Sequence, residues 1–581
     1  MSSTAGAATG DCASSSGCTE DAQTARAFTE SVGVNTHIGY DDSAYGQSWP
    51  MVRDRLVELG VRHIRDASHR DGTRLSDVVP RYNELAGLGI RGNLLAGDPL
   101  RRYGSGTIDQ HLSWVKRNVA GFTESLEGPN EYDYPAVDSD WAANLRAYQC
   151  EWARQVRADP DLSAKPVIGP SSRSGKGFDS ALGDLTACLD RGNLHPYPGD
   201  HSPNRTNFGD LSISTTDARS TSGNKPVWAT ESGYHNAVKC SGCGHLPVSE
   251  TAAGAYLPRM FMENFRRGIP RTYSYELIDG WPDPEKDEPE RNFGLLRNDG
   301  SRKPGFVAIR NLLSILADTG AASGRLSYSL RCTSCPVALR HVLLRKSTGA
   351  YYLVVWPESS IWDRATRTDI ASSRQYADLT IASPLSKLEL LDPAQSTTPS
   401  YTSASRSHRI PLSDRLSVIR ITPPSSSPKA PPSSPKAPSS SPKAPSPSAA
   451  TTPTSTPRSS CSGRIARRGS RVDSALAWTA VRTARRLTAM GLRGLERRRA
   501  VRVLARAAKS GRYTIQLGIR GKVAQGGRSF ANKGTRRVVL RLRPRVRLVR
   551  RASHLRTRLR VTFIGKSGKA RSVSRCVTVA R

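Results

Sequence analysis

Residues 122–131 read FTESLEGPNE, a short strand-like run followed by Gly-Pro and closed by Asn130 and Glu131. Seven similar runs, each followed by an amphipathic helical stretch, occur between residues 32 and 316. This alternation predicts a parallel sheet with crossover helices. The eight predicted strands are Val32–Tyr40, Val61–Asp66, Gly89–Ala96, Phe122–Glu127, Pro166–Gly169, Asn193–Tyr197, Pro226–Glu231 and Thr272–Leu277.

Eight strand–helix units in about 290 residues are typical of a (β/α)8, or TIM, barrel. An open, doubly wound α/β sheet would show the same alternation. Its dinucleotide-binding form is disfavoured because no G-x-G-x-x-G motif follows the first strand. We therefore predict a TIM barrel over residues 30–322.

The sequence outside the barrel predicts four further parts. Residues 1–29 are small and polar, and we expect a flexible N-terminus. Residues 323–422 have short alternating strands and no long helix, which predicts a β-sandwich. Residues 423–460 repeat Ser-Pro-Lys-Ala-Pro three times and form a Pro/Ser-rich linker. Residues 461–581 combine arginines with strand-like runs, which predicts a small, basic, all-β C-terminal module.

The strong positive charge belongs to the C-terminal part of the chain. The net charge of the 581 residues is +36, of which residues 461–581 carry about +33 and the linker about +4. The first 422 residues are therefore close to neutral. Three interpretations of the basic tail are possible. It binds an anionic cell-wall or polysaccharide surface, it binds nucleic acid, or it is solvated and has no fixed ligand. We favour the anionic surface, because few aromatic residues interleave the arginines as single-stranded nucleic acid would require.

The cysteines indicate the cellular compartment in which the protein acts. An even count with local pairs predicts disulfides and a secreted protein, although residues 1–29 lack the basic and apolar regions of a signal peptide. A zinc site shared by the two C-x-x-C units is disfavoured by their separation of about ninety residues. The sequence contains no apolar run of about 18 residues, so no membrane span is predicted. The candidate pairs are Cys12/Cys18, Cys240/Cys243, Cys332/Cys335 and Cys461/Cys576.

Two predicted strands end in a carboxylate that carries the functional prediction. The fourth is followed by Asn130 and Glu131, and the seventh ends at Glu231. The C-terminal ends of barrel strands meet at one face, where the catalytic residues of TIM-barrel enzymes lie. Hydrolysis of a glycosidic bond needs two such carboxylates, one to protonate the leaving oxygen and one to attack or to activate water.

The order of these motifs resembles the clan A glycoside hydrolases, with features of family 5 and family 39. The Gly-Pro-Asn-Glu at 128–131 resembles the acid/base motif of the clan, and Glu231 its nucleophile. Ile64-Arg65-Asp66 resembles the basic residue beside the nucleophile, and His195-Pro-Tyr197 its His-x-Tyr motif. The resemblance covers residues 30–422, including the trailing sandwich.

The resemblance implies retaining hydrolysis of O-glycosidic bonds in a poly- or oligosaccharide, with Glu131 as acid/base and Glu231 as nucleophile about 5–5.5 Å apart. It implies that Asn130 bonds the 2-hydroxyl of the sugar and that Arg65 and Tyr197 hold Glu231 ionised and oriented. His195 and Trp281 are expected to bind substrate, Trp281 as a platform for a sugar ring. No metal or cofactor is expected.

Several alternatives remain open. Glu127 competes with Glu131 for the role of acid/base, although Glu131 is favoured because it follows Asn130 at the strand end. Arg65 forms either part of the site or a structural ion pair, with Asp66 or with a helix. The whole chain has a second possible function, a non-catalytic carbohydrate-binding barrel that its basic tail tethers to an anionic surface.

Overall fold

The computed structural model describes residues 17–424, except 70–76, 102–105, 174–176, 208, 333–334, 336 and 372–374, and the backbone of six strands between residues 500 and 580. Two compact units divide the chain, residues 1–432 and 433–581. Cys12, Cys461 and residues 425–460 lie outside the described residues, so the predicted linker and the predicted pairs Cys12/Cys18 and Cys461/Cys576 are not described.

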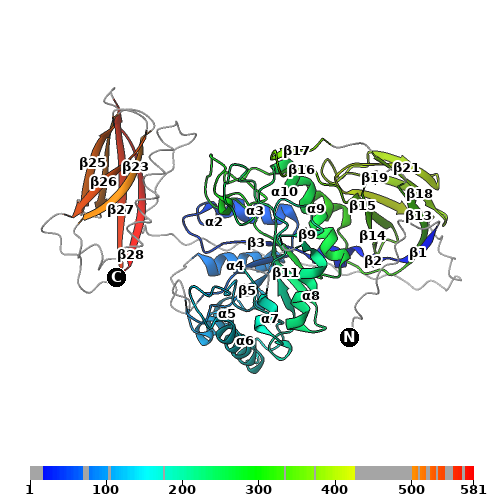
Figure 1. The fold of residues 1–581 in the computed structure, drawn as a ribbon, viewed down its shortest axis with the longest axis horizontal. Helices are drawn as coiled ribbons and strands as arrows, with labels where there is room; N and C mark the ends of the chain where they lie inside the picture. The colour runs from blue at the N-terminus through cyan, green and yellow to red at the C-terminus, as the bar shows by residue number, and fades with distance from the viewer. Residues whose placement is uncertain are drawn as a thin grey trace, which may run out of the picture. The chain divides into compact units, whose positions relative to one another are not determined.

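The first unit contains a parallel eight-stranded barrel, as predicted (Figure 1). Neighbouring strands pair in chain order, and β12 pairs with β3. A bridge between Ile168 and Arg191 joins β7 to the start of β8 and completes the ring. Its strands are β3 Val32–Asn35, β4 His63–Ala67, β5 Arg91–Leu95, β6 Thr123–Glu127, β7 Val167–Ile168, β8 Gly192–Leu194, β11 Val227–Ser232 and β12 Thr272–Ser274.

One helix follows each barrel strand and packs outside the ring (Figure 1). Local signals set several ends: Thr107 and Gln110 form a capping box on α5, and Gly60 ends α3 in the left-handed conformation. No helix among the described residues has both the length and the apolarity to cross a membrane. The eight helices are α3 Trp49–Leu59, α4 Val78–Gly87, α5 Ile108–Asn118, α6 Trp141–Ala158, α7 Phe178–Leu182, α8 Leu211–Ser222, α9 Glu250–Arg266 and α10 Pro304–Leu316.

The barrel also carries short insertions. They are the helix α2 Ala44–Gln47, the 3-10 turns η2 Thr186–Cys188 and η3 Pro289–Arg291, and the small hairpin of β9 Arg205–Thr206 with β10 Gly209–Asp210. The η3 turn belongs to the long connection between β12 and α10. This connection follows the C-terminal end of the last barrel strand, where the candidate site lies.

A β-sandwich follows the barrel, also as predicted. A four-stranded sheet, β1-β13-β18-β21, faces a six-stranded sheet, β2-β14-β15-β22-β19-β20. Alternate apolar residues, such as Leu326, Tyr328 and Leu330, form the core between the sheets. The later strands are β13 Arg325–Arg331, β14 Leu339–Arg345, β15 Tyr351–Pro357, β18 Gln375–Ile381, β19 Lys387–Leu391, β20 Tyr401–Ser403, β21 Ser407–Leu412 and β22 Ser417–Thr422, with the small pair β16 Trp362–Asp363 and β17 Thr368–Asp369.

The N-terminal segment corrects one prediction. We expected residues 1–29 to be flexible, but within the described part of this segment β1 Cys18–Asp21 pairs with β13, and β2 Gln23–Thr24 pairs with β14 (Figure 1). Helix α1 Ala25–Glu30 then leads into the barrel. Residues 18–24 are held because they add a strand to each sheet about 300 residues along the chain, a pairing that local composition does not reveal.

Barrel and sandwich share one continuous apolar core. Val354 and Trp356 on the outer face of β15 belong to the same buried cluster as helices α9 and α10. Strand β15 is buried on both faces, which explains its unbroken apolar run. Arg259 of α9 is fully buried and pairs with Glu358 at 3.1 Å, while donating to two sandwich carbonyls. The sandwich therefore acts as a structural support of the barrel.

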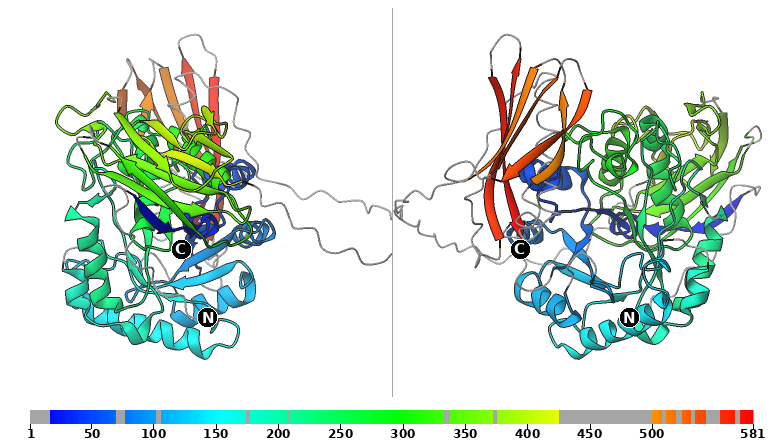
Figure 2. Two further views of the ribbon diagram at one scale, coloured as in Figure 1. Left: turned by 90° about the vertical axis from the view of Figure 1, so that its right-hand side faces the viewer. Right: turned by 60° about the vertical axis from the view of Figure 1, so that its left-hand side comes forward.

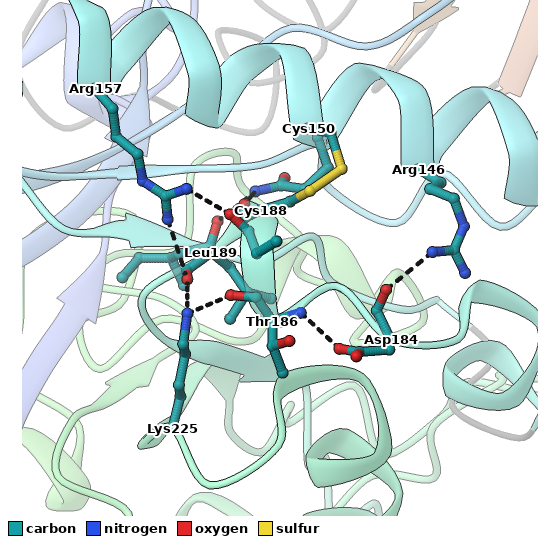
Figure 3. Close-up of a disulfide and its surroundings, with 11 residues drawn as sticks. Arg146, Cys150, Arg157, Asp184, Thr186, Cys188, Leu189 and Lys225 are labelled. Carbon is teal, nitrogen blue, oxygen red and sulfur yellow. Dashed lines mark hydrogen bonds between the residues drawn. A yellow bond between two sulfur atoms is a disulfide. The ribbon is translucent and has the colours of Figure 1, made fainter.

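Three disulfides have both cysteines among the described residues of the first unit. Cys240–Cys243 and Cys332–Cys335 confirm the predicted local pairs and exclude the shared zinc site. The sequence did not predict Cys150–Cys188, which joins α6 to the loop before β8. Figure 3 shows that this loop is also held by Arg146, Arg157 and Lys225, which donate hydrogen bonds to its carbonyl groups.

The second unit contains one antiparallel sheet in the order β23-β26-β25-β24-β27-β28 (Figure 2). The prediction of an all-β module is confirmed for these strands. Four of them overlap strand-like runs in the sequence, namely Tyr513–Ile519, Arg537–Leu542, Leu559–Ile564 and Val573–Val579, and the first and third strands were not predicted. The strands are β23 Ala500–Ala507, β24 Gly511–Gly518, β25 Ala524–Phe530, β26 Gly534–Leu542, β27 His554–Gly565 and β28 Ala570–Ala580.

Candidate active site

The predicted site residues converge at the C-terminal ends of the barrel strands. Arg65 lies on β4, Asn130 and Glu131 follow β6, His195 and Tyr197 follow β8, and Glu231 lies near the end of β11. With the exception of His195, they line a cavity of about 380 Å³, a volume within the range of small-molecule sites.

Arg65 is the centre of this arrangement. Its guanidinium is buried, and all five of its N–H groups donate to neighbouring oxygen atoms. Two of them form a bidentate pair with Glu127 at 2.8 and 2.9 Å, and another reaches Glu231 at 2.5 Å. Arg65 therefore pairs with two strand-end carboxylates and not with Asp66.

Glu127 supports Arg65 from below the cavity. It is fully buried and accepts hydrogen bonds from Arg65, Asn93, Asn193 and Thr230, which come from four different strands. It does not line the cavity. A carboxylate saturated in this way holds the arginine in place and has no free lone pair directed to a substrate. Glu127 is therefore unsuited to the role of acid/base.

Glu231 is held as an anion. Its Oε1 accepts from Arg65, and its Oε2 accepts from the Tyr197 hydroxyl at 2.7 Å. Burial alone would raise the pKa of Glu231, but the charges of His195 and Arg65, with the hydrogen bonds from Tyr197 and Arg65, lower it to about 2. The carboxylate is thus ionised at neutral pH and fixed in orientation, as a nucleophile requires.

Glu131 has a different environment. Its side chain is 30% exposed, and Oε1 lies 2.9 Å from Nδ1 of His195. Its backbone has a φ of 45°, in the left-handed region that residues other than glycine rarely adopt. The N–H of Glu131 donates to the carbonyl and the hydroxyl of Ser171, beyond β7, which stabilises this turn. Strained backbone of this kind is concentrated at functional sites.

His195 connects the two carboxylates. Its Nδ1 lies 2.9 Å from Glu131 and 3.5 Å from Glu231, and its Nε2 lies 3.0 Å from the Thr230 hydroxyl. Burial would lower the pKa of His195, but the charges of Glu231 and Glu131 outweigh this effect and raise it. The imidazole is therefore a hydrogen-bonded part of the site, and not an isolated core histidine.

The two glutamates face each other across the cavity. One carboxylate oxygen from each, with a ring nitrogen of His195, lies in a group whose members are all within 4.8 Å of one another. The residue types also suit a metal ion. The Arg65 guanidinium, however, lies 2.5 Å from Glu231 and would repel a divalent cation at that position. This group therefore suits proton transfer and nucleophilic attack better than metal binding.

The wall of the cavity includes residues that sequence reasoning did not assign, namely Asn35, His37, Tyr40, His245, Tyr275, Glu290 and Phe293. His37 stacks on Tyr40, and the Tyr275 hydroxyl donates to Glu290 at 3.1 Å. Asn35 is the last residue of β3, but the predicted strand extended to Tyr40, so the sequence did not mark Asn35 as a strand-end residue. Glu290 comes from the loop after β12, and no sequence period locates such a residue.

Trp281 lies behind this wall. It is not among the residues that line the cavity, and its ring centroid is 5.8 Å from that of Tyr40, which does line it. Tyr40 is therefore better placed than Trp281 to act as the predicted platform for a sugar ring.

No family model matches the chain, and no curated protein matches it. A family 39 glycoside hydrolase from Bacteroides cellulosilyticus shares 17% identity over 68% of this chain and 82% of its own, with a TM-score of 0.48. A β-1,3-glucanosyltransferase from Rhizomucor miehei shares 17% identity over 47% of this chain and 96% of its own, with a TM-score of 0.35. An endo-laminarinase from Formosa shares 16% identity over 48% of this chain and 87% of its own, with a TM-score of 0.34.

Proposed function

We propose that the chain is a retaining glycoside hydrolase that cleaves β-linked poly- or oligosaccharides by double displacement. One observation carries the proposal: Glu131 and Glu231, at the ends of two barrel strands, each line the cavity and have carboxylate oxygens within 4.8 Å of each other. In retaining enzymes the two carboxyl groups are about 5–5.5 Å apart, and one of them attacks the sugar directly. In inverting enzymes they are about 6.5–9.5 Å apart, which leaves room for a water molecule between them and the sugar.

In the first step, an oxygen of Glu231 attacks the anomeric carbon while Glu131 gives its proton to the glycosidic oxygen. The bond to the leaving group breaks, and a glycosyl ester forms on Glu231. The difference between the two environments supports this assignment. Glu231 is buried and held ionised by Arg65 and Tyr197. Glu131 is more exposed, and none of the described contacts joins it to Arg65.

In the second step, Glu131 removes a proton from water, whose oxygen attacks the anomeric carbon and releases Glu231. Once Glu231 is esterified, its negative charge no longer acts on His195 and Glu131. Glu131 then acts as the general base of this step. Two inversions at the same carbon restore the original configuration.

Asn130 completes the proposed sugar site. Its Oδ1 accepts from Arg65 at 2.6 Å and from Ser171 at 3.2 Å. These bonds fix the orientation of the amide group, and its Nδ2 is then the donor for a sugar hydroxyl. We propose that this hydroxyl is the 2-OH, because a bond there strengthens as the transition state develops.

The test is chemical rescue of Glu231→Ala. We expect this variant to lose turnover of an aryl β-glycoside, and added azide to restore it by forming a glycosyl azide of the opposite anomeric configuration. Residual activity close to that of the wild type, without azide adduct, would remove Glu231 from this role. Glu127→Gln is a poor control because it also disturbs Arg65; Glu290→Gln retains the central ion pairs and is the better one.

The second function, a non-catalytic carbohydrate-binding barrel, predicts a different outcome. Such a protein would bind oligosaccharides without turning over any aryl β-glycoside or β-glucan, and Glu231→Ala would change only its affinity.

We also propose that the chain acts outside the cell. The disulfides Cys150–Cys188, Cys240–Cys243 and Cys332–Cys335 support this, since such bonds form and persist in oxidising compartments. Extracellular poly- or oligosaccharides are then the accessible substrates, and an anionic cell-wall or polysaccharide surface is the proposed partner of the basic C-terminal module.

A further inference from the structure

The register of the C-terminal sheet sorts its arginines by face. In a strand, alternate residues lie on the same face, and residues directly opposite each other in an antiparallel pair share that face. Arg556, Arg558 and Arg560 therefore share one face along β27, at intervals of about 7 Å. Opposite Arg560 stand Gln516 of β24 and Ser574 of β28.

The other strands continue this face. Gln516 stands opposite Gln525, and Gln525 opposite Arg541 of β26. Following the same registers, eight arginines occupy one face, here called the arginine face: Arg502, Arg506, Arg512, Arg537, Arg541, Arg556, Arg558 and Arg560. The opposite face holds only Arg528, Arg536, Arg571 and Arg575, among many aliphatic positions.

Many of the residues that accompany these arginines are polar, although Leu504, Val539 and Ile564 share this face. Thr514, Thr562, Ser572 and Thr578 lie on the arginine face, as do the two glutamines. No strand of this sheet contains Asp or Glu. The three aromatic residues of the strands, Tyr513, Phe530 and Phe563, all fall on the opposite face.

We propose that the arginine face binds a linear polysaccharide that carries carboxylate groups, such as a polyuronate. A guanidinium matches a planar carboxylate with two parallel hydrogen bonds. Regularly spaced arginines suit a polymer with regularly spaced charges, and the interleaved Thr, Ser and Gln residues suit sugar hydroxyls. Single-stranded nucleic acid fits less well, because its bases need aromatic surfaces to stack on and this face has none at its strand positions.

Binding by the arginine face does not depend on the barrel being an enzyme. It gives the C-terminal unit a role as a binding module that holds the whole chain on an acidic polysaccharide. The barrel would then work at a high local concentration of the polymer to which the module is bound.

The experiment compares two full-length variants that lose the same charge. One is Arg556→Gln/Arg558→Gln/Arg560→Gln on the arginine face; the matched control is Arg528→Gln/Arg571→Gln/Arg575→Gln on the opposite face. Affinity electrophoresis in gels containing polygalacturonate, neutral dextran or no polymer measures binding, at two salt concentrations. Circular dichroism checks that each variant is folded.

We expect wild-type protein to be retarded by polygalacturonate and not by dextran, with less retardation at high salt. The arginine-face variant should bind about ten-fold more weakly, and the control less than about three-fold. If the first variant does not fold, Arg502→Gln/Arg506→Gln/Arg541→Gln tests the other end of the same face. Equal losses in both variants, absence of binding to polygalacturonate, or tighter binding to DNA than to polygalacturonate would overturn the proposal.

Discussion

Replacing Tyr197 by phenylalanine tests the electrostatics of the proposed nucleophile. The hydroxyl of Tyr197 donates a 2.7 Å hydrogen bond to Glu231, within a buried environment. A hydrogen bond to a charged group contributes about 1.5–3 kcal/mol, and one pKa unit corresponds to about 1.36 kcal/mol. Loss of this bond should therefore raise the pKa of Glu231 from about 2 by roughly one to two units.

The sign of the effect on activity follows from the mechanism. Glu231 must be ionised to attack, so a higher pKa removes the active form as the pH falls. The acidic limb of kcat/KM, which reports the free enzyme, should move to higher pH by about one to two units. The phenyl ring fills the same space beside Phe293 and His245, so the alkaline limb should change little.

The assay is a pH profile of kcat/KM on an aryl β-glycoside. Tyr275→Phe is the matched control, because its hydroxyl lies at the same cavity but donates to Glu290 and not to Glu231. An unchanged acidic limb in Tyr197→Phe, or an equal shift in Tyr275→Phe, would refute the assignment of the Tyr197 hydroxyl to Glu231.

Three further predictions concern other parts of the molecule. Glu131→Gln should slow hydrolysis about 10²–10⁴-fold for leaving groups that need a proton and much less for a dinitrophenyl leaving group; steady-state kinetics with an equal loss on both would argue against the acid role. Cys150→Ser/Cys188→Ser should lower the free energy of unfolding by about 2–4 kcal/mol, and unchanged midpoints in denaturant would contradict this. Arg259→Met should cost about 3–5 kcal/mol by removing the cation nearest to buried Glu358, and Glu358→Gln in the same chain should recover part of the loss.

The barrel strands were predictable because each is a short buried run with its own local signal. Residues 227–231, for example, fall within β11, whose six residues are all buried. The two strand-end glutamates were predictable for the same reason, since their positions follow from the strand ends alone. Neither prediction needed any contact between distant residues.

The network around Arg65 was not predictable in this way. It exists because closure of the barrel brings the end of β4 beside the ends of β6 and β11, and the sequence alone left Arg65 between a site role and a structural ion pair. Strand β6 adds a further complication. A register irregularity in its pairing with Gly92 and Asn93 of β5 interrupts the alternation of its side chains between the two faces of the sheet. Glu124 and Glu127, three residues apart, therefore contact His63 and Arg65, respectively, which are two residues apart on β4.

Long-range pairings account for the remaining differences. Cys18 stands opposite Tyr328 in the sandwich, and Cys150 bonds Cys188 across 38 residues. Residues far apart in sequence carry no periodic signal of such contacts. The N-terminal strands and this disulfide therefore appear only in three dimensions.

The anomeric configuration of the first-formed product tests the central claim most directly. Proton NMR during the earliest minutes of hydrolysis of an aryl β-glycoside distinguishes the two anomers before they interconvert. If Glu131 and Glu231 act as acid/base and nucleophile at the separation described, the β-anomer appears first and the α-anomer grows only by mutarotation. An α-anomer formed first would contradict double displacement and the roles assigned to both glutamates.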